Sequence, residues 1–174
     1  LLFLMCFSTT FQAQGVDVIV WMDNSGSVNA TEYEAMATTT RNFIDATLTC
    51  NPSKNRVAVV EYGQAQLSNG SRPKRIFIES DFTNNAATAK NFSRRGTLTI
   101  PTPANEVGFN DEAHSALGLI GDALDGINNT GIVSTQKTLT RTPGNRLVVF
   151  FITDAERNYF PGSSLVNPSS GDVF

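Results

Sequence analysis

The sequence predicts an α/β fold with an open, mostly parallel sheet, and three observations lead to this prediction. Two strongly apolar segments rich in β-branched residues, 16–22 and 147–153, would each form a buried strand. Each of these segments is followed directly by an aspartate. Segments with a helical spacing of apolar residues alternate with the expected strands. This alternation is typical of α/β sheets that bind their ligands beyond the carboxyl ends of the strands.

The first expected strand, 16–22, reads VDVIVWM and is almost wholly apolar, as in a strand buried on both faces. A polar turn follows it. A helix is expected over 31–49, where apolar residues recur at helical spacing. Thr31 and Glu34 predict a capping box at the start of this helix, and Asn51-Pro52 predicts its end.

Two further strands are expected at 57–62 and 76–78. The dipeptide Asn69-Gly70 between them is a strong hairpin signal, which predicts that they pair antiparallel. Residues 81–92 are interpreted as a short helix. The basic pair Arg94-Arg95 that follows is expected to be solvated surface.

A second long helix is expected from Asp111 onward, and a second buried strand at 147–153 follows it. One face of this helix would carry the apolar residues Ala113, Ala116, Leu117, Ile120, Leu124 and Ile127. The strand ends next to Asp154, which places a carboxylate at the end of another strand of the sheet.

The two ends of the chain predict that it is part of a longer secreted protein. An apolar run over 1–7 precedes small and polar residues, so 1–15 is expected to be a partial secretory signal and 16–174 the domain. A buried N-terminal strand is the alternative for the apolar run. Residues 161–174 read as loop, so the domain is expected to be incomplete at its C-terminus. The expected location is secreted or at the cell surface.

The composition limits the kinds of site that the protein could hold. The chain has 174 residues, is 40% apolar and has a formal net charge of −3, so nucleic acid is not an expected partner. No run of about 20 apolar residues predicts a transmembrane segment. Two Cys and one His disfavour a zinc site, whereas 16 acidic residues leave oxygen ligands available. After signal removal Cys50 would be either a free, buried thiol or paired with a cysteine beyond Phe174.

Asp23, Ser25 and Ser27 form a D-x-S-x-S motif directly after the first strand. Alternate residues of an extended turn point the same way, so one carboxylate and two hydroxyls can converge on a point. Hard divalent cations, Mg²⁺ in particular, prefer such oxygen ligands. Asp154 would add a second carboxylate if the strand before it is a neighbour of the first strand.

The segments DVIVWMDNSGSV, RVAVVEYG and LVVFFITDA, in this order, resemble a von Willebrand factor type A domain with a metal-ion-dependent adhesion site. The resemblance runs from about Val16 to Asp154. It implies a Rossmann-like sheet, mostly parallel with one antiparallel edge strand and with helices on both faces. It also implies that the metal ligands of this family correspond to Asp23, Ser25, Ser27 and the strand-end Asp154.

The middle ligand of the site departs from the family pattern. The family tends to have a Thr there, ahead of a helix with Ala-Leu, and counting back from Ala116-Leu117 places Asp111 at this position, with Asn110 beside it. Asp111 can ligate a cation, and a third carboxylate would tighten binding and favour Mn²⁺ or Ca²⁺ alongside Mg²⁺. The alternative is that Asn110 or Asp111 only caps the helix.

The resemblance implies a non-enzymatic module for adhesion or protein interaction. An acidic residue of a partner protein would complete the coordination of a divalent cation held by Asp23, Ser25, Ser27, Asp111 and Asp154. One alternative is a metal-free scaffold domain of a larger secreted assembly, and another is a metal-dependent hydrolase. The hydrolase is disfavoured because the sole imidazole, His114, accompanies no recognisable nucleophile motif.

Overall fold

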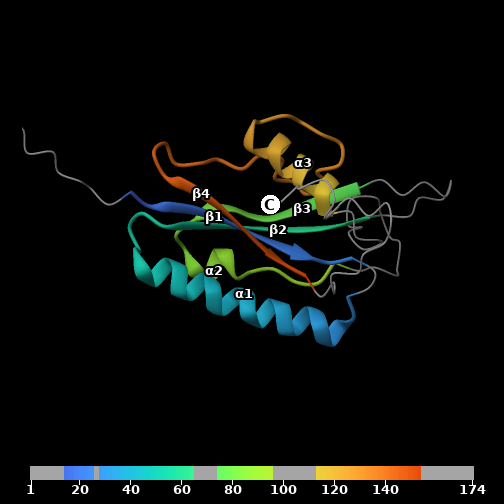
Figure 1. The fold of residues 1–174 in the computed structure, drawn as a ribbon, viewed down its shortest axis with the longest axis horizontal. Helices are drawn as coiled ribbons and strands as arrows, with labels where there is room; N and C mark the ends of the chain where they lie inside the picture. Colours follow the sequence, from blue (N-terminus) through green and yellow to red (C-terminus); the bar gives the residue numbers. More distant parts are fainter. Residues whose placement is uncertain (1–13, 26–27, 65–73, 96–112, 154–174) are drawn as a thin grey trace, which may run out of the picture.

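A computed structural model describes residues 14–25, 28–64, 74–95 and 113–153. They form a four-stranded sheet with helices on both faces (Figure 1). The strands are β1 (Val16–Asp23), β2 (Arg56–Gln64), β3 (Lys74–Thr83) and β4 (Arg146–Ile152). The helices are α1 (Ala30–Cys50), α2 (Ala86–Ala89) and α3 (Ala113–Leu124). Nearly all of the expected signal, 1–15, and the C-terminal residues 161–174 lie outside the described residues.

The strand order in the sheet is β3-β2-β1-β4. β1 pairs in parallel with both β2 and β4, and β3 pairs antiparallel with β2 at the edge. The described residues therefore have the α/β class that the sequence predicts, with a mostly parallel sheet and one antiparallel edge strand. The expected turn at Asn69-Gly70, between β2 and β3, lies outside the described residues.

Two apolar layers cover the sheet, one on each face. On one face Val18 and Val20 of β1 pack in the same cluster as Ile44 of α1, and α2 lies on this side too. On the other face Ile19 and Trp21 belong to the cluster that contains the buried residues of α3. Successive strand residues point to opposite faces, so burial of both sets confirms the prediction that the first strand is buried on both sides.

The start of α1 differs from the prediction. Asn29 is the N-cap, and its side chain accepts hydrogen bonds from the backbone N–H groups of Thr31 and Glu32 at 2.9 and 3.0 Å. Glu32 in turn accepts a hydrogen bond from the Asn29 N–H at 2.8 Å. The predicted cap, Thr31 with Glu34, is therefore wrong, because Asn29 and Glu32 have the same capping-box spacing and Asn is a strong cap. The predicted end at Asn51, the C-cap, is confirmed.

Two other predictions about helices are wrong, because one helix begins later and the other ends earlier than the sequence predicts. β3 continues to Thr83, so the helix expected over 81–92 is reduced to the short α2. Ile127, expected on the apolar face of α3, is 51% exposed. The helix has already ended at Leu124, and Gly126 has a φ of +73°, a left-handed conformation that commonly terminates helices.

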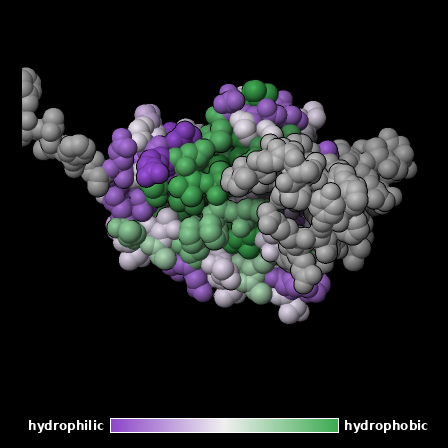
Figure 2. All heavy atoms as spheres, in the orientation of Figure 1, coloured by the Kyte–Doolittle hydropathy of each residue, from purple (hydrophilic) through white to green (hydrophobic). Residues whose placement is uncertain are grey.

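β4 is less buried than the sequence predicts. Val148, Val149 and Phe150 are 41%, 40% and 40% exposed. In the described residues β4 pairs with β1 on one side, and this edge position explains the exposure. Phe150 still stacks on Phe43 of α1, with ring centroids 4.5 Å apart. Figure 2 shows hydrophobic residues at the surface in the middle of the molecule, in the region where β4 lies in Figure 1.

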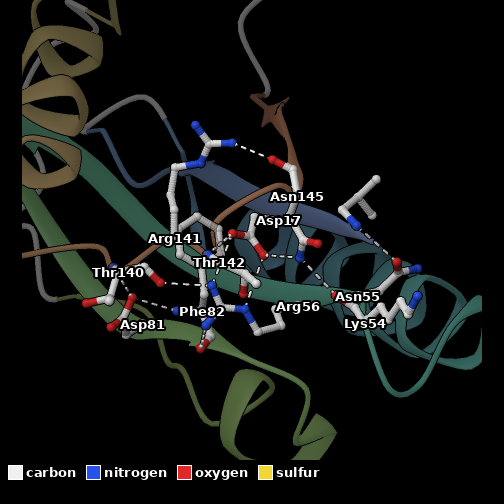
Figure 3. Close-up of polar contacts among 11 residues, drawn as sticks. Asp17, Lys54, Asn55, Arg56, Asp81, Phe82, Thr140, Arg141, Thr142 and Asn145 are labelled. Carbon is white, nitrogen blue, oxygen red and sulfur yellow. Dashed lines mark hydrogen bonds and ion pairs between the residues drawn. The ribbon is translucent and has the colours of Figure 1, made fainter. Parts of the chain in front are cut away.

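A network around Asp17 fastens the sheet where β1 begins (Figure 3). The buried carboxylate accepts hydrogen bonds from Nε and Nη2 of Arg56 at 3.1 and 3.0 Å. It also accepts from the Thr142 N–H at 2.6 Å and from the Asn145 amide at 2.9 Å. Burial raises the pKa of Asp17, but these donors outweigh it and hold the pKa below its ordinary value. The network joins β1, β2 and the segment before β4.

Cys50, the last residue of α1, is an exposed free thiol, so its expected burial is wrong. Its pairing with a cysteine beyond Phe174 stays a prediction. None of the helices in the described part of the chain is long and apolar enough to cross a membrane.

Candidate metal site

Asp23 and Ser25 lie where the central strand β1 ends, between β2 and β4. Both residues are fully buried. The chain leaves β1 at a point with one parallel neighbour on each side, and ligands of open α/β sheets bind beyond the carboxyl ends of strands at such points. The structure thus brings two of the five predicted ligands together at the expected place in the sheet.

Three donors hold the Asp23 carboxylate. Oδ1 accepts a hydrogen bond from the Ser25 N–H at 2.8 Å, which folds the turn back onto the end of the strand. Oδ2 accepts hydrogen bonds from the hydroxyls of Tyr62 at 2.8 Å and Thr153 at 2.6 Å. Tyr62 is in register with Asp23 on β2, and Thr153 directly follows β4. The carboxylate is therefore tied to both neighbouring strands.

Tyr62 and Thr153 are not among the site residues predicted from the sequence. Tyr62 is the last residue of the apolar segment VAVVEY, and Thr153 is the last residue of LVVFFIT. Both segments are predicted strands that come after the first strand in the sequence. The available sequence signal was a hydroxyl-bearing residue at the carboxyl end of each of these apolar segments. This signal does not by itself indicate a contact with Asp23, because the contact depends on which strands pair.

The hydrogen-bond partners of Asp23 in the described part of the chain carry no positive charge. Hydroxyl and amide donors orient a carboxylate and satisfy its lone pairs, but they do not neutralise it. A buried carboxylate is costly unless it is paired with a cation or coordinates a metal. A cation bound at this end of the sheet would offset that cost.

The donor set fits a hard divalent cation. Within the described residues Oδ1 of Asp23 accepts one hydrogen bond, so it retains a lone pair for a cation or for a cation-bound water. Ser25 belongs to the same turn and contributes a hydroxyl oxygen. A site with oxygen ligands of this kind suits Mg²⁺, Mn²⁺ or Ca²⁺.

The other three predicted ligands, Ser27, Asp111 and Asp154, lie outside the described residues. Asp154 is the residue after Thr153, whose hydroxyl contacts Asp23. Among the described residues no group of three or more His, Cys, Asp or Glu side chains could hold a metal ion.

A second buried carboxyl group, that of Glu61, lies at the same end of the sheet. It accepts hydrogen bonds from the Tyr33 hydroxyl and from the side-chain amide of Asn24, the latter at 3.1 Å. Burial, followed by the charge of Glu79, raises the pKa of Glu61 to about 8, although Tyr33, Arg95 and Asn24 act in the opposite direction. Glu61 therefore holds its proton at neutral pH. The sequence signal was an acidic residue in an otherwise apolar strand segment.

Arg94 and Arg95 hold the turn that follows β1. The Arg95 carbonyl accepts a hydrogen bond from the Asn24 side chain at 3.3 Å, and Arg94 donates to the Val28 carbonyl at 2.5 Å. The Arg95 guanidinium donates to both carboxylate oxygens of Glu79 at 2.6 and 2.5 Å. The expectation that this basic pair is solvated surface is wrong, because both side chains are half-buried in specific contacts.

Comparison with known proteins assigns no family. No family model matches the sequence, and no curated protein matches it. Among solved structures the chain is similar to the adhesive tip pilin GBS104 from Group B Streptococcus agalactiae, with 19% sequence identity and a TM-score of 0.45. The match covers 90% of this chain and 51% of the pilin chain, so this chain spans about half the length of that protein.

Proposed function

We propose that this chain is a von Willebrand factor type A domain that binds a divalent cation at the carboxyl end of β1 and, through it, an acidic group of a partner protein. The observation that carries the proposal is the fully buried Asp23 carboxylate at the end of the central strand, held by neutral donors beside Ser25. The resemblance of three sequence segments to those of this family also supports the proposal.

The proposed ligand set extends from the two described residues to three others. Ser27 lies two residues after Ser25, and Asp154 follows the residue that contacts Asp23. We propose that these two and Asp111 complete the set, directly or through water. Mg²⁺ is the proposed cation because a few protein oxygens plus waters suit its octahedral coordination, with Mn²⁺ and Ca²⁺ as alternatives.

A bound cation would supply a positive centre with open coordination positions, which a carboxylate from another protein can occupy. The residues of this chain then have the task of holding and orienting oxygen atoms. Tyr62 and Thr153 fix Asp23 between the strands, and the Asp23–Ser25 hydrogen bond shapes the turn. Such a site binds without proton transfer or bond cleavage, so the proposed role is non-enzymatic. The apolar run at 1–7 supports a proposed location outside the cell or at its surface.

Calorimetric titration with Mg²⁺, Mn²⁺ and Ca²⁺ tests the cation site. The chain is expected to bind at least one of them with a Kd below about 1 mM. Asp23→Asn should weaken binding at least about tenfold, since it removes the charge of a ligand. Asp45→Asn is the matched control, because Asp45 is an exposed carboxylate on α1 that pairs with Lys90. Equal binding by the wild type and Asp23→Asn would contradict the site, and no binding by the wild type would favour the metal-free scaffold.

Peptide capture tests the proposed partner chemistry. A panel of immobilised peptides with a central Glu, each matched with a Gln version, is offered to the chain in Mg²⁺ and in EDTA. We expect retention on some Glu peptides in Mg²⁺, with loss in EDTA and on the Gln versions. Retention that persists in EDTA would contradict a bridge through the cation.

A further inference from the structure

Glu61 occupies a position that apolar residues normally fill. It is fully buried on β2, in register with Met22 of β1, and Val59 and Val60 before it are fully buried apolar residues. Burying a carboxyl group in such a strand costs free energy unless hydrogen bonds satisfy it. Replacement of a whole buried ionic group and its partners by apolar residues of similar volume is often neutral or stabilising, so stability alone is a weak reason for a carboxyl group here.

The contacts of Glu61 lead to the turn that carries Ser25. Its Oε2 accepts a hydrogen bond from the Asn24 side chain at 3.1 Å, and Asn24 is the residue between Asp23 and Ser25. The Asn24 N–H also donates to the Tyr62 carbonyl at 3.1 Å. Asn24 is therefore held by its side chain and by its backbone on two successive residues of β2.

Glu61 and Tyr62, successive residues of β2, hold Asn24 and Asp23 from opposite faces of the sheet. Tyr62, which belongs to the apolar cluster on the α3 side, donates to Asp23. Glu61 contacts Tyr33, which belongs to the cluster on the α1 side, and holds Asn24. The direction in which the chain leaves β1 is thus determined from both faces, with Glu61 responsible for the α1 side.

The far side of the same turn is anchored as well. The Arg95 carbonyl accepts the second hydrogen bond of the Asn24 amide, at 3.3 Å, and the Arg94 side chain holds the Val28 carbonyl. The Val28 N–H donates to the Ser25 carbonyl at 3.2 Å, which closes the turn. Among the described residues Oδ1 of Asn24 is buried without a hydrogen-bond partner, and the two N–H donations hold the Asn24 amide in place.

We propose that Glu61 is a positioning residue of the cation site: through its hydrogen bond to Asn24 it orients the turn so that the Asp23 carboxylate and the Ser25 hydroxyl face the same cation. Glu61 itself does not contact the cation. This inference rests on the proposed function, because it names the residue that organises the same site from the opposite face of the sheet.

Three variants of the full chain test the inference, with Mn²⁺ as the probe. Glu61→Leu removes the acceptor for Asn24, and we expect Mn²⁺ affinity to fall about tenfold or more, as for other residues that orient metal ligands. Glu61→Gln retains an amide oxygen that can accept the same hydrogen bond, so its affinity should stay within about threefold of the wild type. Tyr33→Phe removes the other hydrogen bond of Glu61 without touching the turn, and should lower thermal stability while leaving the affinity within about threefold.

Calorimetry gives the affinities, and electron paramagnetic resonance of bound Mn²⁺ reports the symmetry of its ligands. The spectrum should change in Glu61→Leu and match the wild type in Glu61→Gln. Wild-type affinity in Glu61→Leu, or an equal loss in Glu61→Gln, would overturn the inference. A loss of Mn²⁺ affinity in Tyr33→Phe in proportion to its loss of stability would also overturn the inference, because destabilisation of the fold would then explain the loss of affinity.

Amide hydrogen exchange in EDTA separates this inference from the proposed function. In the metal-free chain the Asn24 and Ser25 amides should exchange at least about tenfold faster in Glu61→Leu than in the wild type or in Tyr33→Phe. If the wild type binds none of Mg²⁺, Mn²⁺ and Ca²⁺, the proposed function fails and the metal-orienting role with it. Unchanged exchange together with normal Mn²⁺ binding by the wild type would overturn the role of Glu61 alone.

Discussion

The two ends of β1 each carry a fully buried aspartate, and the structure holds the two in different ways. At the start of the strand, Arg56 pairs with both oxygens of Asp17, and the pKa of Asp17 lies below its ordinary value. At the other end, the donors to Asp23 among the described residues are two hydroxyls and a backbone N–H, all neutral. The same residue type is thus part of an ion pair at the start of the strand and, at its end, hydrogen-bonded to neutral donors of the described residues, where we propose that a cation binds.

The largest expected effect comes from the same substitution at the two ends. Asp17→Asn should lower the free energy of unfolding by about 3 kcal/mol, because it leaves the Arg56 guanidinium largely buried without its counter-charge. Asp23→Asn in EDTA should cost less than about 1 kcal/mol, because the amide oxygen still accepts from Ser25 and the hydroxyls can turn to accept from the amide nitrogen. Urea unfolding monitored by circular dichroism measures both.

A control for this comparison is Asp45→Asn, which breaks the exposed ion pair with Lys90. It should change the free energy of unfolding by less than about 0.5 kcal/mol. Equal losses in Asp17→Asn and Asp23→Asn would show that both aspartates serve stability, and the contrast between the two ends would be lost.

The next effect sharpens the contrast by adding the cation. Mg²⁺ at about 100 times its Kd should raise the free energy of unfolding of the wild type by about 2.7 kcal/mol, since it binds the folded chain alone. Asp23→Asn should lose at least about half of this gain, whereas Asp45→Asn should retain it. Thermal unfolding with and without Mg²⁺ gives the result. A full gain in Asp23→Asn would place the cation elsewhere on the chain.

The smallest expected effect, taken per pH unit, is a pH dependence that originates at the Asp23 end. Glu61 has a pKa of about 8 in the folded chain against an ordinary value of 4.5, so between these values the folded chain holds a proton that the unfolded chain has lost. Its contribution to stability is complete below pH 4.5 and is lost as the pH rises to about 8, by at most about 1.4 kcal/mol per pH unit. The contribution of Asp17, whose pKa is lowered, is already complete in this range.

Urea unfolding in EDTA from pH 5 to pH 9 measures this slope. Glu61→Gln should flatten it, leaving a weaker dependence from Glu79, whose pKa burial also raises. Identical slopes in the wild type and Glu61→Gln would show that Glu61 does not carry the pH dependence.

Much of the fold could be predicted because its signals are local in the sequence. The β-branched run of β1 indicated a strand buried on both faces, and the helical spacing after it indicated α1. The strand-end position of Asp23 followed from the same run, the antiparallel pairing of β2 and β3 from the hairpin signal at Asn69-Gly70, and the edge position from the family resemblance. The exposed edge at Val149 and the cap at Asn29 were mispredicted, since one depends on the neighbours of a strand and the other on a choice between two equally spaced capping boxes.

Hydrophobic periodicity and motif spacing depend on neighbouring residues, so they were enough to predict the class of the sheet and the position of Asp23 and Ser25 after its first strand. The groups that surround these two residues depend on how the strands pair. Tyr62 and Thr153 lie 39 and 130 residues from Asp23 in the sequence, and strand pairing brings their hydroxyls to its carboxylate. The ion pair of Asp17 is likewise a tertiary property, since Arg56 reaches Asp17 through the parallel pairing of β1 and β2. A composition with few Cys and His could therefore indicate an oxygen-ligand site, but its geometry depends on contacts between distant residues.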